Sequence, residues 1–480
     1  MKLPKIRLSE DTMYIIFYYI LIFSTFLNQA VLNFPIPGIG SVYLFRIMLA
    51  VMTSLTIYRL YKKKESVKIG NMQKCLLALF VIVGIYGAVT LFFAKDFTNT
   101  VSVLINWIID GIFLVVFICF NNTPKRLKHT FIGVMANTLL MILLAVVESF
   151  TGAIFFPEMA TGTERVLFFD FGLNKMIYVY NKNPNYTATL VVFGVLLSLI
   201  YLMCKIAVNE SNKKGNKLYY ILCACLLSLG FYIGVYTLAR LAQLALIGAL
   251  ILIALFTIIF ARKKKRIFMV IAIVCCFFLV KLASSYPIVK VKVENTTIYV
   301  QSMFEKTKPV YKEEPQAYPN SIVISKKDFE TNGTGSGNIR LNLVKFALKT
   351  AVNSHGLGVG MGNTIYLAAQ DPVLQKNQVY AIHCFPIRLV ADFGIFALIP
   401  MAMYAFLLVF KLVKLYTRDF KKSLFHKSFI FFIAVTAALL PLGIILPSDA
   451  QDYWLMWICL SVLAVLLDET IVFSSEQLED

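Results

Sequence analysis

The sequence is poor in charged residues. Asp, Glu, Lys and Arg make up only 15% of the 480 residues, whereas 59% are hydrophobic and the mean hydropathy is +0.75. A soluble globular protein of this length could not cover its surface with so few charged side chains. The scarcity of charge therefore excludes a soluble globule and indicates a polytopic membrane protein.

The sequence also lacks the cysteine pairs that are typical of disulfide or zinc sites and the basic stripe that is typical of nucleic-acid binding. None of the nine cysteines belongs to a CxxC pair and most lie in apolar runs, which argues against a disulfide framework and a zinc site. The formal net charge is +20, but Lys and Arg occur in short clusters between apolar runs instead of a basic stripe. The sequence therefore predicts no nucleic-acid partner.

Long apolar runs are the main feature that is present. A membrane-spanning helix needs about 20 apolar residues, and about twelve runs meet this requirement. The predicted fold class is an all-α polytopic membrane protein with about 12 transmembrane helices. The runs lie near 13–33, 42–60, 75–94, 99–120, 130–149, 186–205, 218–238, 241–260, 267–284, 386–410, 428–447 and 452–468.

Basic residues alternate from one loop to the next, which predicts the topology. By the positive-inside rule, the basic loops and both termini are cytoplasmic, whereas the loops with at most one basic residue face outward. The first apolar run is too long for a signal-peptide core, so it is expected to be retained. The basic loops lie near 59–68, 124–128, 212–217, 261–266 and 411–427, and the others lie at 34–41, 95–98, 448–451 and near 239.

This topology divides the chain into three parts. Residues 1–284 are predicted to form nine spans with an outer loop at 150–185, and residues 386–480 three further spans and a cytoplasmic tail. Between them, residues 285–385 form an extracytoplasmic loop that is too long for a simple connector and is expected to be folded or functional. Helical spacing near 340–352 predicts an amphipathic helix in this loop. Its apolar positions are Leu341, Val344, Ala347, Leu348 and Ala351.

Two residues on the predicted outer side are candidates for chemistry. Arg240 lies between two apolar runs with no acidic residue within ten positions, and such a charge is costly unless it faces a polar cavity or a partner. His383 lies at the entrance of the tenth span, where its ordinary pKa would suit a general base. For both residues a contact with lipid headgroups is the alternative. His355 is the second histidine on this side.

Polar residues also interrupt the second and fourth spans. Arg46 lies in the second span, and Asn106 and Asp110 lie in the fourth. We expect an ion pair between Arg46 and Asp110, and two interpretations stay open: a structural pair, or part of a proton or substrate path.

The segment HGLGVGMGN at 355–363 is rich in glycine. It follows an amphipathic helix instead of a strand and has no βαβ pattern around it, which argues against dinucleotide binding. A tight turn or a close backbone approach is the better interpretation. No Asp-x-Asp pair or carboxylate cluster lies on the predicted outer side, which argues against a metal site.

The order of these motifs resembles the O-antigen ligase and polysaccharide polymerase family of bacterial envelope glycosyltransferases. The matching segments are T-x-[SA]-R at Thr237–Arg240, Arg340 followed by G-x-G-x-G-N at Gly358–Asn363, and His383 to Gly394 with Asp392 in register. Asn-Pro-Asn at 183–185 is similar to the family's entry to a span. Departures from the family pattern are Ala239, Leu241, Cys384 and Pro386.

The resemblance implies a GT-C-like, inverting and metal-independent glycosyltransferase without a cofactor. Arg240 and Arg340 would bind the substrate diphosphate, because planar guanidinium groups suit phosphate oxygens, and His383 would be the catalytic base. The supporting candidates are Asn185, Gly360, Asn363, Arg388 and Asp392. We expect the glycines to act as hinges between Arg340 and His383, with Arg240 completing the site from the bundle.

The resemblance also implies partners and a location. Donor and acceptor would be undecaprenyl-pyrophosphate-linked oligosaccharides in the lipid bilayer, and other envelope polysaccharide assembly proteins are expected partners. The chain would be a multi-pass protein of the bacterial cytoplasmic (inner) membrane, with cytoplasmic termini and an extracytoplasmic active site.

The leading function is a polymerase that joins lipid-linked repeat units of a capsule, exopolysaccharide, O-antigen or teichuronic-type glycan. The first alternative is a ligase that transfers finished glycan to an acceptor; it is less favoured because a lipid A acceptor needs an outer membrane, which nothing in the sequence indicates. A glycolipid transporter or flippase is disfavoured because the halves of the chain do not repeat. A non-catalytic membrane scaffold is the remaining alternative.

Overall fold

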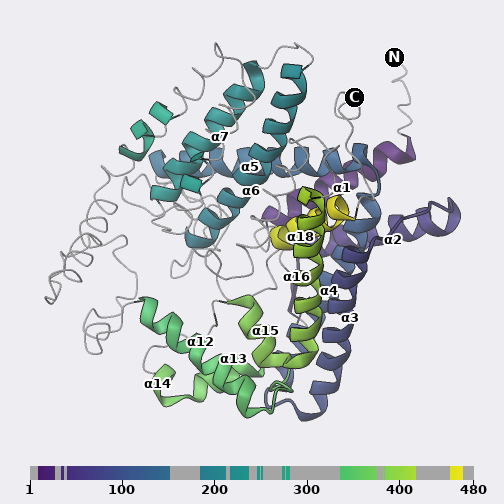
Figure 1. The fold of residues 1–480 in the computed structure, drawn as a ribbon, viewed down its shortest axis with the longest axis vertical. Coiled ribbons are helices and arrows are strands. Elements are labelled where there is room, and N and C mark those ends of the chain that lie inside the picture. Colours follow the sequence, from purple (N-terminus) through teal and green to yellow (C-terminus); the bar gives the residue numbers. More distant parts are fainter. Residues whose placement is uncertain are drawn as a thin grey trace, which may run out of the picture. The chain divides into compact units, whose positions relative to one another are not determined.

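A computed structural model gives the architecture of the chain (Figure 1). It describes residues 9–27, 34–36, 40–151, 184–211, 217–236, 246–248, 250–251, 273–275, 277–281, 336–375, 382, 384–417 and 454–468. The predicted spans at 241–260 and 428–447 lie largely or wholly outside these residues.

The described part is almost entirely helical. Its helices are α1 (Glu10–Leu27), α2 (Leu44–Lys62), α3 (Asn71–Thr90), α4 (Phe97–Phe120), α5 (Pro124–Thr151), α6 (Pro184–Ser211), α7 (Lys217–Tyr236), α12 (Ser336–Asn353), α13 (Asn363–Gln370), α14 (Pro372–Gln375), α15 (Phe385–Phe393), α16 (Ile395–Thr417) and α18 (Trp454–Leu467). A short 3-10 helix, η2 (Leu91–Phe93), follows α3. The exception is a small antiparallel hairpin of β1 (Phe34–Ile36) and β2 (Gly40–Val42), with Phe34 opposite Val42.

Six of the described helices are long and apolar enough to span a membrane. The chain is therefore an all-α membrane protein, as its composition predicts. The six candidate spans are Glu10–Leu27, Leu44–Lys62, Asn71–Phe93, Phe97–Phe120, Pro124–Ser149 and Ile395–Lys414, and shorter apolar helices cover Thr187–Leu199, Leu218–Gly234 and Trp457–Leu467.

The predicted span at 386–410 differs from the structure. Gly394, with φ of 56°, separates α15 from α16, and the candidate span begins only at Ile395. Hydropathy alone does not reveal this break, because the apolar run continues through the glycine.

Contacts divide the chain into two units. The first unit comprises Met1–Gly133 and Asn332–Asp480, and the second comprises Val134–Thr331. In the first unit, α3 packs against α4 and α16, α18 packs against α3 and α4, and α12 packs against α15 (Figure 1). In the second unit, α6 packs against α7.

A cluster of buried aromatic rings forms the core of the first unit. The Trp454 ring lies 3.8 Å from that of Phe45 and the Trp457 ring 4.5 Å from that of Phe80, measured between centroids. Trp107 lies 4.6 Å from Phe80 and donates its indole N–H to the Phe80 carbonyl. Such pairs stabilise a fold by about 0.5–1.5 kcal/mol each beyond their buried area. The rings join α2, α3, α4 and α18 into one body.

At one end of this unit, the Asp468 carboxylate caps α3. It accepts the backbone N–H groups of Met72 and Gln73 at 3.0 Å each, and Lys411 Nζ lies 2.5 Å from Oδ1. These N–H groups have no partner within the helix, so the carboxylate supplies the bonds that a helix N-terminus lacks. The contact ties the start of α3 to α16 and to the end of α18.

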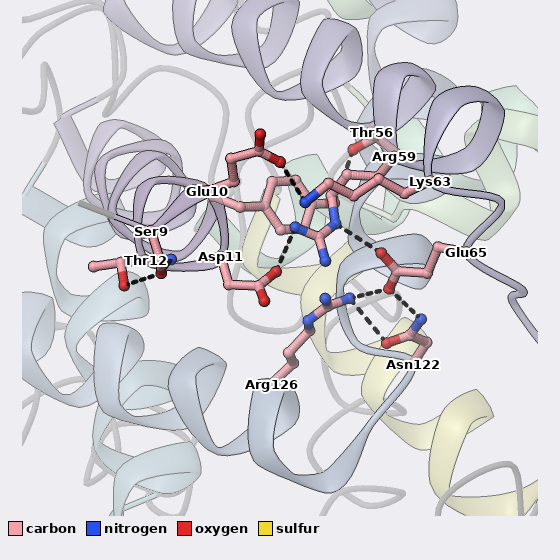
Figure 2. Close-up of polar contacts among 11 residues, drawn as sticks. Ser9, Glu10, Asp11, Thr12, Thr56, Arg59, Lys63, Glu65, Asn122 and Arg126 are labelled. Atoms are coloured by element: carbon pink, nitrogen blue, oxygen red, sulfur yellow. Dashed lines mark hydrogen bonds and ion pairs between the residues drawn. The ribbon is translucent and has the colours of Figure 1, made fainter. Parts of the chain in front are cut away.

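An ion-pair cluster links α1, α2 and the start of α5 (Figure 2). Glu65 accepts hydrogen bonds from Arg59 at 2.7 Å, Arg126 at 2.5 Å and Asn122 at 3.0 Å. Asp11 also pairs with Arg59, at 2.6 Å. Burial raises the pKa of the Glu65 carboxyl, but the hydrogen bonds from Arg126, Arg59 and Asn122 outweigh it and lower the pKa to about 2. Glu65 is therefore ionised in the folded protein.

Replacing Glu65 by Gln should destabilise the protein by about 1–3 kcal/mol at neutral pH, because Arg126 would lose its carboxylate partner. The folded-state pKa is lowered, so the stabilisation exists above the unfolded value of about 4.3 and is lost as the pH falls toward 2. Thermal melts in detergent should show a constant difference from the wild type between about pH 5 and 8, and a shrinking one below about pH 4.

Glu10→Gln is the matched control for this melt. The Glu10 side chain is 62% exposed and pairs with Lys63, so its loss should change stability by at most about 1 kcal/mol. Equal effects of the two substitutions would show that the ion-pair cluster does not stabilise this end of the unit.

Candidate functional site

The segment that carries the glycine motif forms a tight loop between α12 and α13, which we call the glycine loop (residues 354–362). Its glycines alternate with other residues and all have positive φ. The values are 78° at Gly356, 83° at Gly358, 95° at Gly360 and 76° at Gly362, and His355 also has a positive φ of 54°. The predicted tight turn is thus present.

The glycine loop lies against the junction of α15 and α16. Val359 and Gly360 donate their N–H groups to the carbonyls of Ala391 and Asp392, at 3.0 and 2.8 Å, and Ile395 donates to the Gly356 carbonyl at 2.8 Å. The backbones approach so closely that a Cβ on Gly358 would lie 2.5 Å from the Asp392 carbonyl oxygen. Any larger residue at position 358 must displace the loop.

The Asp392 carboxylate fastens the loop to the start of α13. Thr364 donates its N–H at 3.1 Å and its hydroxyl at 2.5 Å to Oδ1, and Gly362 donates its N–H to Oδ2 at 3.3 Å. Arg388 Nε lies 3.8 Å from Oδ2, and Asp392 is only 2% exposed. Both oxygens are engaged within the protein, so Asp392 holds the glycine loop to the start of α13.

The other side of the glycine loop contacts the ends of α3 and α4. Asn99 Nδ2 donates to the Gly362 carbonyl at 3.2 Å, and the Thr100 hydroxyl donates to the Met361 carbonyl at 2.9 Å. Met361 N–H donates to the Thr90 hydroxyl at 3.3 Å. The loop is therefore held on two sides, which differs from the expectation that its glycines are hinges.

The helix before the loop packs on the segment that precedes α15. Ala347 of α12 forms a buried cluster with Ile382 and Ala391. The structure places the predicted amphipathic helix within Ser336–Asn353, but Leu341 and Leu348 of the predicted apolar face are 50% and 47% exposed. The buried positions are Leu343, Ala347, Thr350 and Ala351, because the helix presents a face rotated from the apolar stripe.

Comparison with known proteins identifies this part of the chain. Residues 223–402 match the family model described as O-antigen ligase, and this segment includes α12, the glycine loop and α15. We call residues 223–402 the O-antigen ligase domain, after the family model that they match. The family resemblance that the motifs carry is confirmed.

A curated relative matches over a longer part of the chain. The teichuronic acid biosynthesis protein TuaE of Bacillus subtilis (strain 168) is 22% identical over 427 residues, covering 86% of this chain and 76% of that protein. Together with the O-antigen ligase domain and the membrane-spanning helices, this similarity supports a ligase- or polymerase-type role in glycan biosynthesis at a membrane.

The structure brings four of the predicted site residues together within the O-antigen ligase domain. Gly360, Arg388 and Asp392 meet as described above, and Asn363 closes the loop by donating Nδ2 to the Val359 carbonyl at 2.9 Å. Asn363 Oδ1 is buried and has no hydrogen-bond partner among the described residues.

The remaining predicted site residues are described incompletely or not at all. Arg240 and His383 lie outside the described residues. For Arg340 in α12 and Asn185 in α6, the structure describes the backbone and not the side chain. The convergence of Arg240, Arg340 and His383 stays a prediction.

Sequence reasoning missed the partners that hold the glycine loop. Thr364 follows the motif directly, and Thr90, Asn99 and Thr100 lie more than 250 residues before it. The signal that could have revealed these partners is the presence of polar residues at the ends of two consecutive spans. In an apolar environment, such hydrogen-bonding groups are expected to bind one another or the backbone.

Gly358→Ala should abolish glycan assembly and lower the melting temperature, because the new Cβ would meet the Asp392 carbonyl at 2.5 Å. Gly356→Ala is the matched control: its φ is also positive, but its nearest neighbour would be a flexible Ile395 methyl at 3.8 Å. The control should cost only the backbone penalty of about 1–2 kcal/mol. Glycan analysis and thermal melts of both variants test this, and equal losses would show that the close approach is unimportant.

Proposed function

We propose that this chain is a polysaccharide polymerase that joins undecaprenyl-pyrophosphate-linked repeat units at the outer face of the bacterial cytoplasmic membrane. In this proposal the O-antigen ligase domain is of the GT-C type, the bundle has about twelve spans, and both termini are cytoplasmic. The teichuronic acid named for the Bacillus subtilis relative accords with a teichuronic-type glycan as product.

The observation that supports this proposal best is the packing of α12 on the segment before α15. Ala347 contacts Ile382, which directly precedes His383 in the sequence. Position 340 lies on the same face of α12 as Leu343 and Ala347, since residues spaced by three, four and seven share a helix face. The helix that carries Arg340 and the segment that carries His383 are therefore neighbours. Position 340 is separated from the contact at Ala347 by a rise of about 10 Å along α12.

The proposed chemistry is an inverting transfer at the anomeric carbon. A hydroxyl of the acceptor glycan attacks this carbon, and its proton passes to His383 as general base. The bond from the anomeric carbon to the diphosphate oxygen breaks, and the electron pair leaves with the diphosphate. Arg240 and Arg340 stabilise the charge that develops on the leaving group.

The glycine loop and Asp392 serve this chemistry by positioning. The loop connects the helix of Arg340 to the junction before the α16 span, and its bonds to α3 and α4 fix that connection against the bundle. A fixed arrangement favours catalysis because small displacements of reacting groups lower the rate strongly.

Substituting His383 by Ala should abolish polymer synthesis while the protein still reaches the membrane. Chain-length analysis of glycan from a complemented deletion strain measures this, with immunoblots of membranes as the expression control. Retained long-chain polymer would contradict the role of His383 as base.

The companion variant is His355→Asn, because Asn tolerates the positive φ of this position. Chain synthesis should persist in this variant. Loss of synthesis in His355→Asn with retention in His383→Ala would transfer the role of base to His355.

A ligase is the second candidate, because the matching family is described as O-antigen ligase. Analysis of the lipid-linked glycan in a deletion strain separates the two functions. A polymerase predicts that single lipid-linked repeat units accumulate. Accumulation of complete chains that remain unattached to their acceptor would contradict the polymerase and establish the ligase.

A further inference from the structure

Arg46 of α2 stands out among the charged residues of the first unit. Its Nη2 donates to Asn106 Oδ1 at 2.5 Å, and its guanidinium lies 5.1 Å from the centre of the Tyr43 ring. Its Nε is buried, with no hydrogen-bond partner in the part of the chain that the structure describes. The predicted ion pair with Asp110 is replaced by a bond to the neutral Asn106, one helical turn earlier on α4.

The other arginines of the described part are neutralised. Arg59 pairs with Asp11 and Glu65, Arg126 pairs with Glu65, and Arg388 lies beside Asp392. Among the arginines whose side chains the structure describes, Arg46 alone forms no ion pair with a carboxylate.

The absence of a described carboxylate within ion-pair distance is unfavourable where Arg46 lies. The residue is in the first turn of α2, at the start of a candidate span, where both the apolar surroundings and the positive end of the helix dipole disfavour a cation. A neutral amide orients the guanidinium but does not compensate its charge. An anion bound at this position would do so.

One face of α4 connects Arg46 to the glycine loop. Asn99 donates to the Gly362 carbonyl, a Cβ on Gly362 would meet Val103 at 3.3 Å, and Asn106 accepts from Arg46. Positions 99, 103 and 106 are spaced by four and seven residues and so share a face. The rise from 99 to 106 is about 10 Å, so Arg46 belongs to the same end of the unit as the candidate site.

We propose that Arg46, oriented by Asn106, binds the diphosphate of a second polyprenyl-linked glycan, the acceptor. This proposal rests on the proposed polymerase function, in which two diphosphate-bearing lipids react in each turnover. Arg240 and Arg340 are assigned to the donor, which leaves the acceptor diphosphate without a binding residue. The guanidinium of Arg46 is a planar cation that suits phosphate oxygens, and its buried Nε has no hydrogen-bond partner among the described residues.

The stoichiometry of lipid binding tests this proposal. The full-length protein is reconstituted in nanodiscs of zwitterionic phosphatidylcholine and titrated with undecaprenyl diphosphate, and bound lipids are counted by native mass spectrometry. The wild type should bind two molecules. Arg46→Gln should bind one, with the second weakened roughly tenfold or more, and Arg46→Lys should weaken it less because the charge remains.

Three outcomes would overturn the proposal, and they are distinguishable. Two tightly bound molecules in Arg46→Gln, with one lost in Arg240→Gln, would refute the acceptor subsite and leave the donor site standing. Displacement of the Arg46-dependent lipid by equimolar phosphatidylglycerol would make Arg46 a phospholipid headgroup contact. Absence of specific binding in the wild type would refute the polymerase function as well. Thermal melts of each variant verify that it is folded.

Discussion

The buried Asp392 carboxylate is the constraint on which the candidate site depends. It receives three hydrogen bonds from Gly362 and Thr364, while its own backbone carbonyl accepts from Gly360. A buried carboxylate with fewer partners would be strongly unfavourable, so the loop and the end of α15 must stay together for either to be stable. That one arrangement fixes the positions of three helix ends: the end of α12, the start of α13 and the start of α16.

The glycine loop extends this constraint to the bundle. Thr90, Asn99 and Thr100 bind its backbone from the ends of α3 and α4, while Asp468 closes the opposite end of α3. The first unit is therefore fastened at both ends of the same helix by polar contacts between residues far apart in sequence. In an apolar environment such contacts are specific, because an unsatisfied backbone group is costly there. In the proposed function, this frame would preserve the geometry of the site while a lipid-linked substrate binds.

The sequence predicts the helices of this frame well, because the length and composition of an apolar run are local properties. It also predicts the turn at the glycine motif, since alternating glycines suit few other structures. It does not predict that Gly394 divides the tenth apolar run, because a glycine hardly changes the mean hydropathy of its window. The choice of Asn106 over Asp110 as the partner of Arg46 depends on the relative rotation and height of two helices, which no local pattern contains.

Local sequence patterns do not contain contacts between distant residues, and this also explains why the glycines were expected to be hinges whereas the structure shows an anchored loop. Glycine permits both flexibility and close packing, and only the distant partners decide which applies. Those partners, Thr90 and Asn99 among them, carry no motif of their own. The proposed roles of Arg240 and His383 rest on the resemblance and on the family match to residues 223–402, whereas the anchoring of the loop rests on geometry.

Hydrogen–deuterium exchange across residues 356–364 of the solubilised protein tests the anchored loop most directly. The amides of Val359, Gly360, Met361, Gly362 and Thr364 all donate hydrogen bonds within the protein. In an anchored loop, these amides should exchange as slowly as the amides of the neighbouring helices. Exchange at the rate of an unstructured peptide would contradict it.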